Sequence, residues 1–287
     1  IQAEKKNMRV KKYSGELVPF DETALRRSLS RSGANDQEVN MVYESIKGSV
    51  YDGIPTKELY EMAFNALRGK KNSYAARYSL KRAIRELGPE GFYFEKWIAR
   101  LFQEDGYEAV TGQTVQGHAV SHEIDVVALK GNEMLAIECK FRNDADAKIS
   151  VTTPMYFKSR KEDITGISYH FFNQNHEFTD GWLVTNAYLT SDSIAFGNYY
   201  KVNLLSWDYP RGSSLKKRVD SNAEYPVTCL TNISEQDKAM LLKFQCILVK
   251  DLVKSPQILD KIQVAKDKQK LILMEANELI NSPLEHE

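Results

Sequence analysis

Two apolar segments joined by a short polar turn constrain the fold of this chain more than any other feature. Residues 123–129 read Glu-Ile-Asp-Val-Val-Ala-Leu, and residues 134–141 read Met-Leu-Ala-Ile-Glu-Cys-Lys-Phe. A Lys-Gly-Asn turn lies between them. Aliphatic runs of this length around a glycine turn predict two antiparallel strands in a hairpin. The middle of the chain is therefore expected to contain a sheet.

The segments on either side of this hairpin predict an α/β domain. The apolar residues of 92–104 recur at helical spacing, and helical patterns also cover 152–165 and 191–200. Apolar strands are predicted at 181–185 and 202–207. Strands that alternate with helices are typical of this class of domain.

The first 88 residues predict a small domain of their own. Residues 8–20 alternate around a Ser-Gly turn as a hairpin does, and Asp21 and Thr56 are typical helix N-caps. Gly88-Pro-Glu-Gly91 then marks a boundary. The helices predicted before this boundary cover residues 21–32, 36–50, 56–68 and 73–87.

The last part of the chain predicts a helical module with short helices near 234–244, 247–253 and 266–281. The predicted domains are therefore 1–88, 89–219 and 220–287. The predicted fold class is multidomain α+β. A helical first domain with a small β-hairpin precedes an α/β core with a central mixed sheet, and an all-α module follows.

Composition excludes several classes of protein. No run approaches the ~18 consecutive apolar residues of a membrane helix, and the polar start lacks the apolar region of a signal peptide. Three widely spaced cysteines exclude a disulfide scaffold and a paired-cysteine zinc site, and they suit a reducing cytoplasm. We therefore expect a cytoplasmic protein with no membrane partner.

Net charge does not decide whether the chain binds nucleic acid. The formal charge is zero overall, but it is +5 for residues 1–90, −2 for 91–219 and −3 for 220–287. A locally acidic middle segment can still bind DNA if its carboxylates hold divalent cations.

Asp125, Glu138 and Lys140 form the constellation that can carry chemistry. Residues i and i+2 of a strand share a face, so Glu138 and Lys140 lie side by side, and the hairpin brings Asp125 next to them. Burying such charges costs several kcal/mol unless something compensates. Mg²⁺ compensates well because it takes one or two carboxylates and keeps its waters. Such an ion activates water near a phosphate.

Less specific candidates surround this constellation. A Glu-x-Lys pair on a strand is also typical of a solvated surface, and Glu123 shares the face of Asp125. His170 and His176 lack ligand spacing and are expected to lie in a loop. The cations Lys158, Arg160 and Lys161 fit either a DNA-backbone contact or an ordinary solvated helix face.

The order of motifs in 92–208 resembles the Mrr-like type IV restriction endonucleases of the PD-(D/E)xK superfamily. The resemblance implies Asp125 and Glu138 as ligands of Mg²⁺ or Mn²⁺, Lys140 as catalytic lysine and Glu95 as an additional acidic residue. Ser121-His-Glu123 replaces the glycines that usually precede the Asp, and the helix after the Lys lacks the family's Gln. The matching segments are Phe94-Glu95, Asp105-Gly-Tyr107, Ile124-Asp-Val126, Ile137-Glu-Cys-Lys140, Leu183-Val-Thr-Asn186 and Leu204-Leu-Ser-Trp-Asp208.

Residues 8–88 resemble an ATP-cone, a small nucleotide-sensing domain. The resemblance implies that Lys12, with Lys11 beside it, contacts phosphates and that Thr56 contacts the base of ATP or dATP. Two positions depart from the pattern, where Ala24 and Tyr13 stand in place of family cations. Both a nucleotide-binding cone and a cone kept as a scaffold stay open. The matching segments are Val10-Lys-Lys-Tyr-Ser-Gly15, Val18-Pro-Phe-Asp21, Leu29, Gly53-Ile-Pro-Thr56, Ala76-Arg-Tyr78 and Ala83-Ile84.

The tail from Tyr225 to Leu279 resembles a helix-hairpin-helix unit, although the usual glycine is absent; a helical interaction module is the alternative. Together these features predict a metal-dependent DNA endonuclease of the restriction or repair class, with nucleotide regulation. A catalytically inactive DNA-binding or nucleotide-sensing regulator on the same fold is the alternative, and an RNA nuclease is a weaker one. Cutting both strands needs two active sites, which favours a homodimer.

Overall fold

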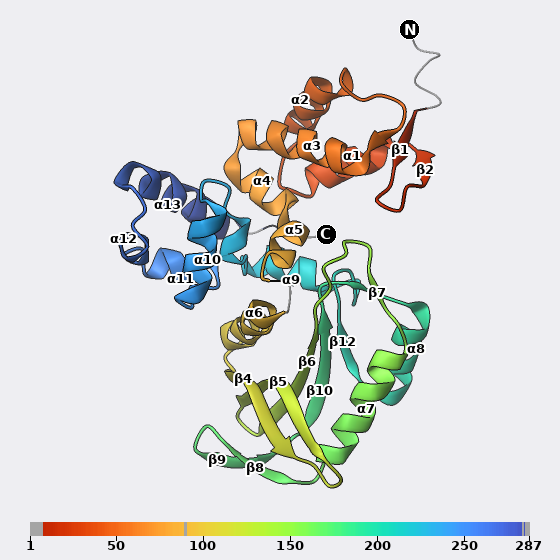
Figure 1. Cartoon of the computed structure of the whole chain (residues 1–287), viewed down its shortest axis with the longest axis vertical. Coiled ribbons are helices and arrows are strands. Elements are labelled where there is room, and N and C mark those ends of the chain that lie inside the picture. The colour runs from red at the N-terminus through yellow and green to blue at the C-terminus, as the bar shows by residue number, and fades with distance from the viewer. Residues whose placement is uncertain (1–7, 89–90, 283, 285–287) are drawn as a thin grey trace.

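The computed structural model describes residues 8–88, 91–282 and 284 of the chain. These residues form an N-terminal domain, an α/β domain and a helical C-terminal module (Figure 1). The sheet of the α/β domain is mixed, as predicted. Pro89 and Glu90, which belong to the predicted boundary, lie outside the described residues.

The N-terminal domain packs helices against a three-stranded sheet of order β2-β1-β3. The predicted hairpin is confirmed, and the Asp21 side chain caps the first helix by accepting from the Ala24 N–H. Thr56 is not an N-cap, because Pro55 holds that position and the Thr56 hydroxyl donates to the Lys11 carbonyl at 3.0 Å. The elements are β1 (Arg9–Lys11), β2 (Leu17–Pro19), α1 (Glu22–Ser30), α2 (Asp36–Lys47), β3 (Ile54–Pro55) and α3 (Thr56–Lys70).

The helix predicted over 73–87 is wrong, because the chain breaks it at Ser79 into α4 (Asn72–Tyr78) and α5 (Leu80–Arg85). The Ser79 hydroxyl donates to the Ala76 carbonyl at 3.1 Å, a local bond that competes with regular helix. Near this break the chain passes from one core to another, and Ala76 on α4 already belongs to the second. Ala75 packs inside the N-terminal domain, whereas the apolar side chains of α5 join the core around the first helix of the α/β domain.

Five strands in the order β12-β10-β6-β5-β4 form the central sheet. The hairpin β5–β6 is confirmed, and β6, β10 and β12 run parallel. Strand β4 was not predicted; its sequence Glu-Ala-Val-Thr-Gly-Gln-Thr-Val-Gln is mostly polar because it lies at the sheet edge. The strands are β4 (Glu108–Gln116), β5 (Ser121–Lys130), β6 (Glu133–Lys140), β10 (Asp180–Thr185) and β12 (Asn203–Leu205).

Helices cover both faces of this sheet (Figure 1). The predicted helices over 92–104, 152–165 and 191–200 are confirmed as α6 (Phe92–Glu104), α7 (Thr152–Ile164) and α8 (Ser191–Tyr200). α6 packs on the face of Ile137, whereas α7 packs on the opposite face, where Phe157 meets Leu183. His170 and His176 lie on strands rather than in a loop. The small strands are β7 (Lys148–Ile149) with β11 (Tyr188–Leu189), and β8 (Ser168–Phe171) with β9 (Gln174–Glu177).

The C-terminal module packs against α6 and continues the same apolar core. The Trp97 indole on α6 donates to the Glu224 carbonyl at 3.1 Å, which joins the two parts. Among the described residues no helix is long and apolar enough to cross a bilayer. The three predicted tail helices are confirmed, with α9 and α12 in addition. The module contains α9 (Leu215–Asn222), the 3-10 turn η2 (Val227–Cys229), α10 (Glu235–Lys243), α11 (Val249–Lys254), α12 (Ile258–Lys261) and α13 (Lys266–Asn281).

Because α5 packs in the core that the α/β domain shares with the C-terminal module, we expect Ile84→Ala to destabilise that part of the chain. Ile84 is fully buried, and such a truncation costs about 2–5 kcal/mol. All three tryptophans follow residue 91, so tryptophan fluorescence during urea unfolding reports on this part of the chain. Leu29→Ala, equally buried but in the core of the N-terminal domain, is the control. An equal shift of the fluorescence midpoint in both variants would contradict the assignment of α5.

Candidate active site

The strands β5 and β6 separate at the point where the candidate residues lie. Their last paired residues in this direction are Val126 and Ile137, so Asp125 has no backbone partner on β6. The Asp125 carboxylate instead accepts the Cys139 N–H at 2.7 Å. A side-chain oxygen thereby takes the place of a ladder carbonyl, which fixes Asp125 beside the end of β6.

Strand alternation places Glu138 and Lys140 together, as predicted. Cys139 points to the other face and is buried in the core around α6. The Lys140 ammonium lies 2.5 Å from Glu138 Oε1. The Glu138 side chain is only 5% exposed, so this carboxylate depends on nearby cations for its stability.

A second cation reaches Glu138 from helix α7. Arg160 Nη1 lies 2.6 Å from Glu138 Oε2, and Arg160 Nη2 donates to the Glu123 carbonyl. The predicted alternative of a solvated helix face is therefore wrong for Arg160. Its sequence neighbours pair elsewhere, Lys158 with Glu162 and Lys161 with Asp180.

Glu95 joins the cluster from the first turn of α6. Burial, followed by the charges of Asp125 and Glu123, raises the pKa of Glu95 to about 7. Helix α6 starts close to the end of β6 because Gly91 has a left-handed φ of 82° and its Cα lies against Phe141, where a Cβ would meet the Phe141 Cβ at 3.0 Å. A glycine is therefore required at the start of this helix.

The electrostatics of Asp125 reflect the same crowding of carboxyl groups. Burial, followed by the charge of Glu138, raises its pKa to about 6, while the Cys139 N–H opposes the shift. Carboxyl groups pushed to higher pKa values by burial and by one another are common at functional sites. A cation bound between them would relieve both effects.

The donor set fits Mg²⁺ or Mn²⁺ held by few protein ligands. Among the described residues no three His, Cys, Asp or Glu side chains are grouped as a metal cage. Mg²⁺ commonly takes only one or two carboxylates and completes its shell with water and phosphate oxygens. Asp125 and Glu138 supply hard oxygens of this kind, and Glu95 lies in the same field of charge.

Surrounding residues hold the strand ends that carry the site. The Thr185 hydroxyl donates to the Lys140 carbonyl at 2.5 Å, and the Asn186 amide binds both backbone groups of Arg142. On the other side, the Asp163 carboxylate lies 2.7 Å from His122 Nε2. His122 is thus a structural partner of α7 in this arrangement.

The residues predicted to bind nucleotide lie together on the N-terminal domain. Lys11 ends β1, Lys12 follows it, and the Thr56 hydroxyl bonds the Lys11 carbonyl. Lys12 is half exposed and lies 3.5 Å from the Glu16 carboxylate, a weak surface pair that a phosphate could replace. Tyr13 projects into solvent, with 92% of its surface exposed.

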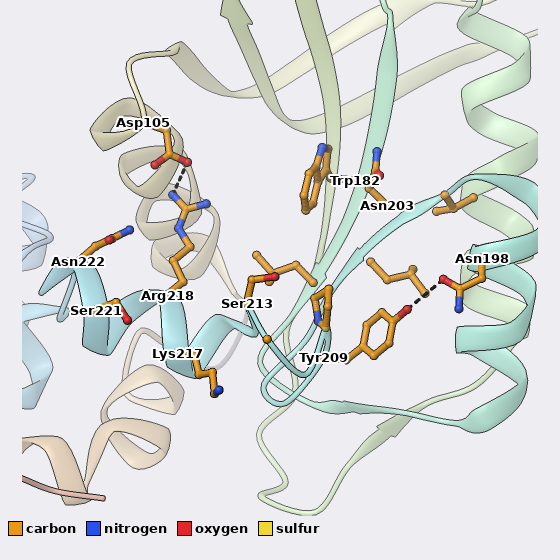
Figure 2. A pocket seen from close by; sticks show the side chains of 15 residues that line it. Asp105, Trp182, Asn198, Asn203, Tyr209, Ser213, Lys217, Arg218, Ser221 and Asn222 are labelled. Atoms are coloured by element: carbon orange, nitrogen blue, oxygen red, sulfur yellow. Dashed lines mark hydrogen bonds and ion pairs between the residues drawn. The ribbon is translucent and has the colours of Figure 1, made fainter. Parts of the chain in front are cut away.

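A cavity in the α/β domain lies away from these residues. It has a volume of about 500 Å³ between the end of α6, the β12 edge of the sheet and α9 (Figure 2). Arg218 on its wall is held by Asp105 at 2.9 Å, and the Tyr209 hydroxyl donates to Asn198 at 2.9 Å. None of the candidate catalytic residues lines this cavity.

Three families of known proteins match three successive segments of the chain. Residues 8–87 match the ATP cone domain, and residues 88–167 match the archaeal Holliday junction resolvase (Hjc) family. Residues 225–280 match the family described as AF1548-like, C-terminal. The Hjc match covers Glu95, Asp125, Glu138 and Lys140.

Two similar proteins match about two thirds of this chain each. A protein of Archaeoglobus fulgidus described as uncharacterized is 29% identical over 184 residues, which are 64% of this chain and 99% of the relative. A solved structure, described as a protein of unknown function AF1548, is 28% identical with a TM-score of 0.54. It covers 66% of this chain and 98% of its own.

These findings confirm the fold class. An ATP-cone domain precedes a nuclease-like α/β domain of the Hjc type, and a helical module follows. The Hjc match supports the PD-(D/E)xK nuclease fold, and it favours DNA as the class of substrate. The narrower Mrr-like resemblance and the helix-hairpin-helix resemblance of the tail stay predictions.

The raised pKa of Glu95 predicts a pH-dependent stability. In metal-free protein, folding must bury this charge above pH 7, so the group disfavours the folded state as pH rises from about 4.5 to about 7. Glu95→Gln removes that cost. We therefore expect its Tm, measured in EDTA, to exceed that of the wild type by a few degrees at pH 8 and to differ little at pH 5.

Glu108→Gln, on the exposed start of β4, is the matched control. Its Tm difference from the wild type should be the same at both pH values. A Glu95→Gln variant that behaves in the same way would show that Glu95 is not buried among carboxylates.

Proposed function

We propose that this chain is a metal-dependent DNA endonuclease in which Asp125, Glu138 and Lys140 hydrolyse a phosphodiester bond. The observation that carries the proposal is the meeting of these three side chains where β5 and β6 separate. The segment that holds them matches a DNA-resolving nuclease family.

Each residue has a role that follows from its surroundings. Asp125 and Glu138 would hold Mg²⁺ or Mn²⁺, which supplies an activated water and neutralises charge on the phosphate. Lys140 is 31% exposed, so its ammonium can reach a phosphate oxygen from the same face as Glu138. Glu95, with a pKa of about 7, can accept or release a proton near neutral pH.

The class of DNA substrate is the finer part of the proposal. The Mrr-like resemblance suggests cleavage of modified duplex DNA, as in restriction. The Hjc match suggests branched DNA. This match comes from a family model, whereas the Mrr-like resemblance rests on the order of motifs alone. Cleavage of both strands would require two active sites and hence a homodimer.

The N-terminal domain is proposed to regulate the nuclease through ATP or dATP. Lys11, Lys12 and Thr56 lie together at one end of the small sheet, as phosphate and base contacts require. The alternative, a catalytically inactive regulator on the same fold, predicts DNA or nucleotide binding without cleavage.

Substitutions at the site should abolish cleavage while leaving the fold intact. We expect Asp125→Asn and Lys140→Met to lower the rate by about 10²–10⁴-fold, the range for loss of a positioned catalytic group. The measurement is Mg²⁺- or Mn²⁺-dependent cleavage of methylated plasmid, unmethylated plasmid and a synthetic four-way junction. Asp192→Asn, on the exposed start of α8, is the control and should cut normally. Full activity of Asp125→Asn would exclude the proposed site.

Nucleotide binding is expected to depend on Lys12. Lys12→Ala should weaken binding of a fluorescent ATP analogue by roughly tenfold or more, because a charge-assisted hydrogen bond to phosphate is lost. Lys57→Ala, an exposed cation on α3, is the control. Equal affinity in the wild type and Lys12→Ala would favour a cone that serves only as a scaffold.

A further inference from the structure

Helix α7 supplies a cation whose position the proposed reaction does not explain. Both oxygens of the Glu138 carboxylate are occupied, one by Lys140 at 2.5 Å and the other by Arg160 at 2.6 Å. The Arg160 side chain is 13% exposed, so its pairing with Glu138 is largely removed from water. An arginine in direct contact with a ligand carboxylate must affect how that carboxylate binds a cation.

The charges of the site balance without a metal. The carboxylates of Asp125 and Glu138 face the cations of Lys140 and Arg160. A divalent ion adds two positive charges to this group, and its approach to Glu138 is opposed by the guanidinium already bound there. The guanidinium therefore has to give up its oxygen for the ion to bind well.

Lys140 and Arg160 differ in how easily they can leave. Lys140 lies on the same strand as Glu138, and both stay on one face whatever binds them. Arg160 comes from a separate helix, and its head group bonds Glu138 and the Glu123 carbonyl. A long arginine side chain can change rotamer at its outer bonds while α7 stays in place.

An aromatic surface lies one helical turn from Arg160. Tyr156 precedes it by four residues, so the two share a side of α7, and the guanidinium is 5.6 Å from the Tyr156 ring centroid. Tyr156 is 63% exposed. The ring can support the guanidinium in a more exposed position, where its fork of N–H donors suits a phosphate.

We propose that Arg160 is exchanged between Glu138 and the DNA backbone: it neutralises Glu138 in the metal-free protein and, once a divalent ion takes its place, binds a phosphate of the substrate. The proposal rests on the nuclease function proposed above. Arg160 would therefore lower the affinity of the protein for metal in the absence of DNA. In the presence of metal it would raise the affinity of the protein for DNA.

The neighbouring Lys158 provides a matched control for metal binding. It is a cation on the same helix, two residues away, but it points to the other side of α7. There it pairs with Glu162 and lies 5.0 Å from the Tyr200 ring centroid. It has no contact with Glu138, so Lys158→Gln should leave Mn²⁺ affinity unchanged.

The first experiment measures Mn²⁺ binding to the full chain without DNA, by electron paramagnetic resonance of free Mn²⁺. Arg160→Gln should bind Mn²⁺ more tightly than the wild type, by about tenfold, equivalent to about 1.4 kcal/mol. Arg160→Lys, which keeps the charge, should fall near the wild type. If Arg160 merely fastens α7 to the sheet, its loss would loosen the site, and Mn²⁺ affinity would fall or stay unchanged. That result would overturn the proposal.

The second experiment measures DNA binding by fluorescence anisotropy with Ca²⁺ and with EDTA. The probe is a labelled four-way junction, with a labelled duplex in parallel. Arg160→Gln should weaken binding in Ca²⁺ by roughly tenfold or more, because a charge-assisted hydrogen bond to phosphate is lost. In EDTA the variant and wild type should bind alike, since Glu138 then holds the arginine. An equal loss under both conditions would mean that Arg160 is a fixed DNA contact and would overturn the exchange.

The failure of this proposal can be told apart from failure of the nuclease function. A wild-type protein that neither binds Mn²⁺ nor cuts DNA would remove the proposed function and the exchange together. If the wild type binds Mn²⁺ and cuts DNA, but Arg160→Gln binds Mn²⁺ no more tightly than the wild type, only the exchange of Arg160 would be excluded. Circular dichroism melts of each variant identify those that fail to fold, and Arg160→Met, which removes the charge but keeps a long side chain, then replaces Arg160→Gln in both experiments.

Discussion

Helix α6 is buried on two sides, and the arrangement of the molecule depends on that burial. One side packs on the sheet, and the other packs on α5 and the C-terminal module, so one apolar core joins three regions of the sequence. Trp97 lies at its centre, fully buried and bonded to the Glu224 carbonyl. The same packing fixes the first turn of α6, where Glu95 faces the carboxylates of the sheet.

The candidate site exploits a place where regular hydrogen bonding stops. Where β5 leaves β6, a carboxylate rather than a carbonyl accepts the Cys139 N–H. This hydrogen bond holds Asp125 near Glu138, although the negative charges of the two carboxylates repel each other. Lys140 and Arg160 offset that repulsion, but burial, followed by the charge of Glu138, still raises the pKa of Asp125. Carboxylate oxygens held this close together are the hard ligands that a divalent cation prefers.

The N-terminal domain is in physical contact with the strands that follow the site. The Lys81 ammonium on α5 lies 3.7 Å from the ring centroid of Tyr188, and burial lowers the pKa of Lys81 to about 8. Tyr188 follows Asn186, whose side chain holds the backbone at Arg142, two residues beyond Lys140. The break at Ser79 is what turns α5 towards these residues.

The sequence by itself determined the local elements and pointed to the residues of the candidate site. Periodicity and turn residues were enough for the β5–β6 hairpin and for α6 and α8, because each depends on interactions within a few residues. Strand alternation alone placed Glu138 beside Lys140. The break at Ser79 and the polar edge strand β4 escaped prediction, because distant packing decides them. Only the tertiary structure brought Arg160 to Glu138 and Glu95 to Asp125. These residues come from segments far apart in the chain, and their proximity depends on how α6 and α7 pack on opposite faces of one sheet.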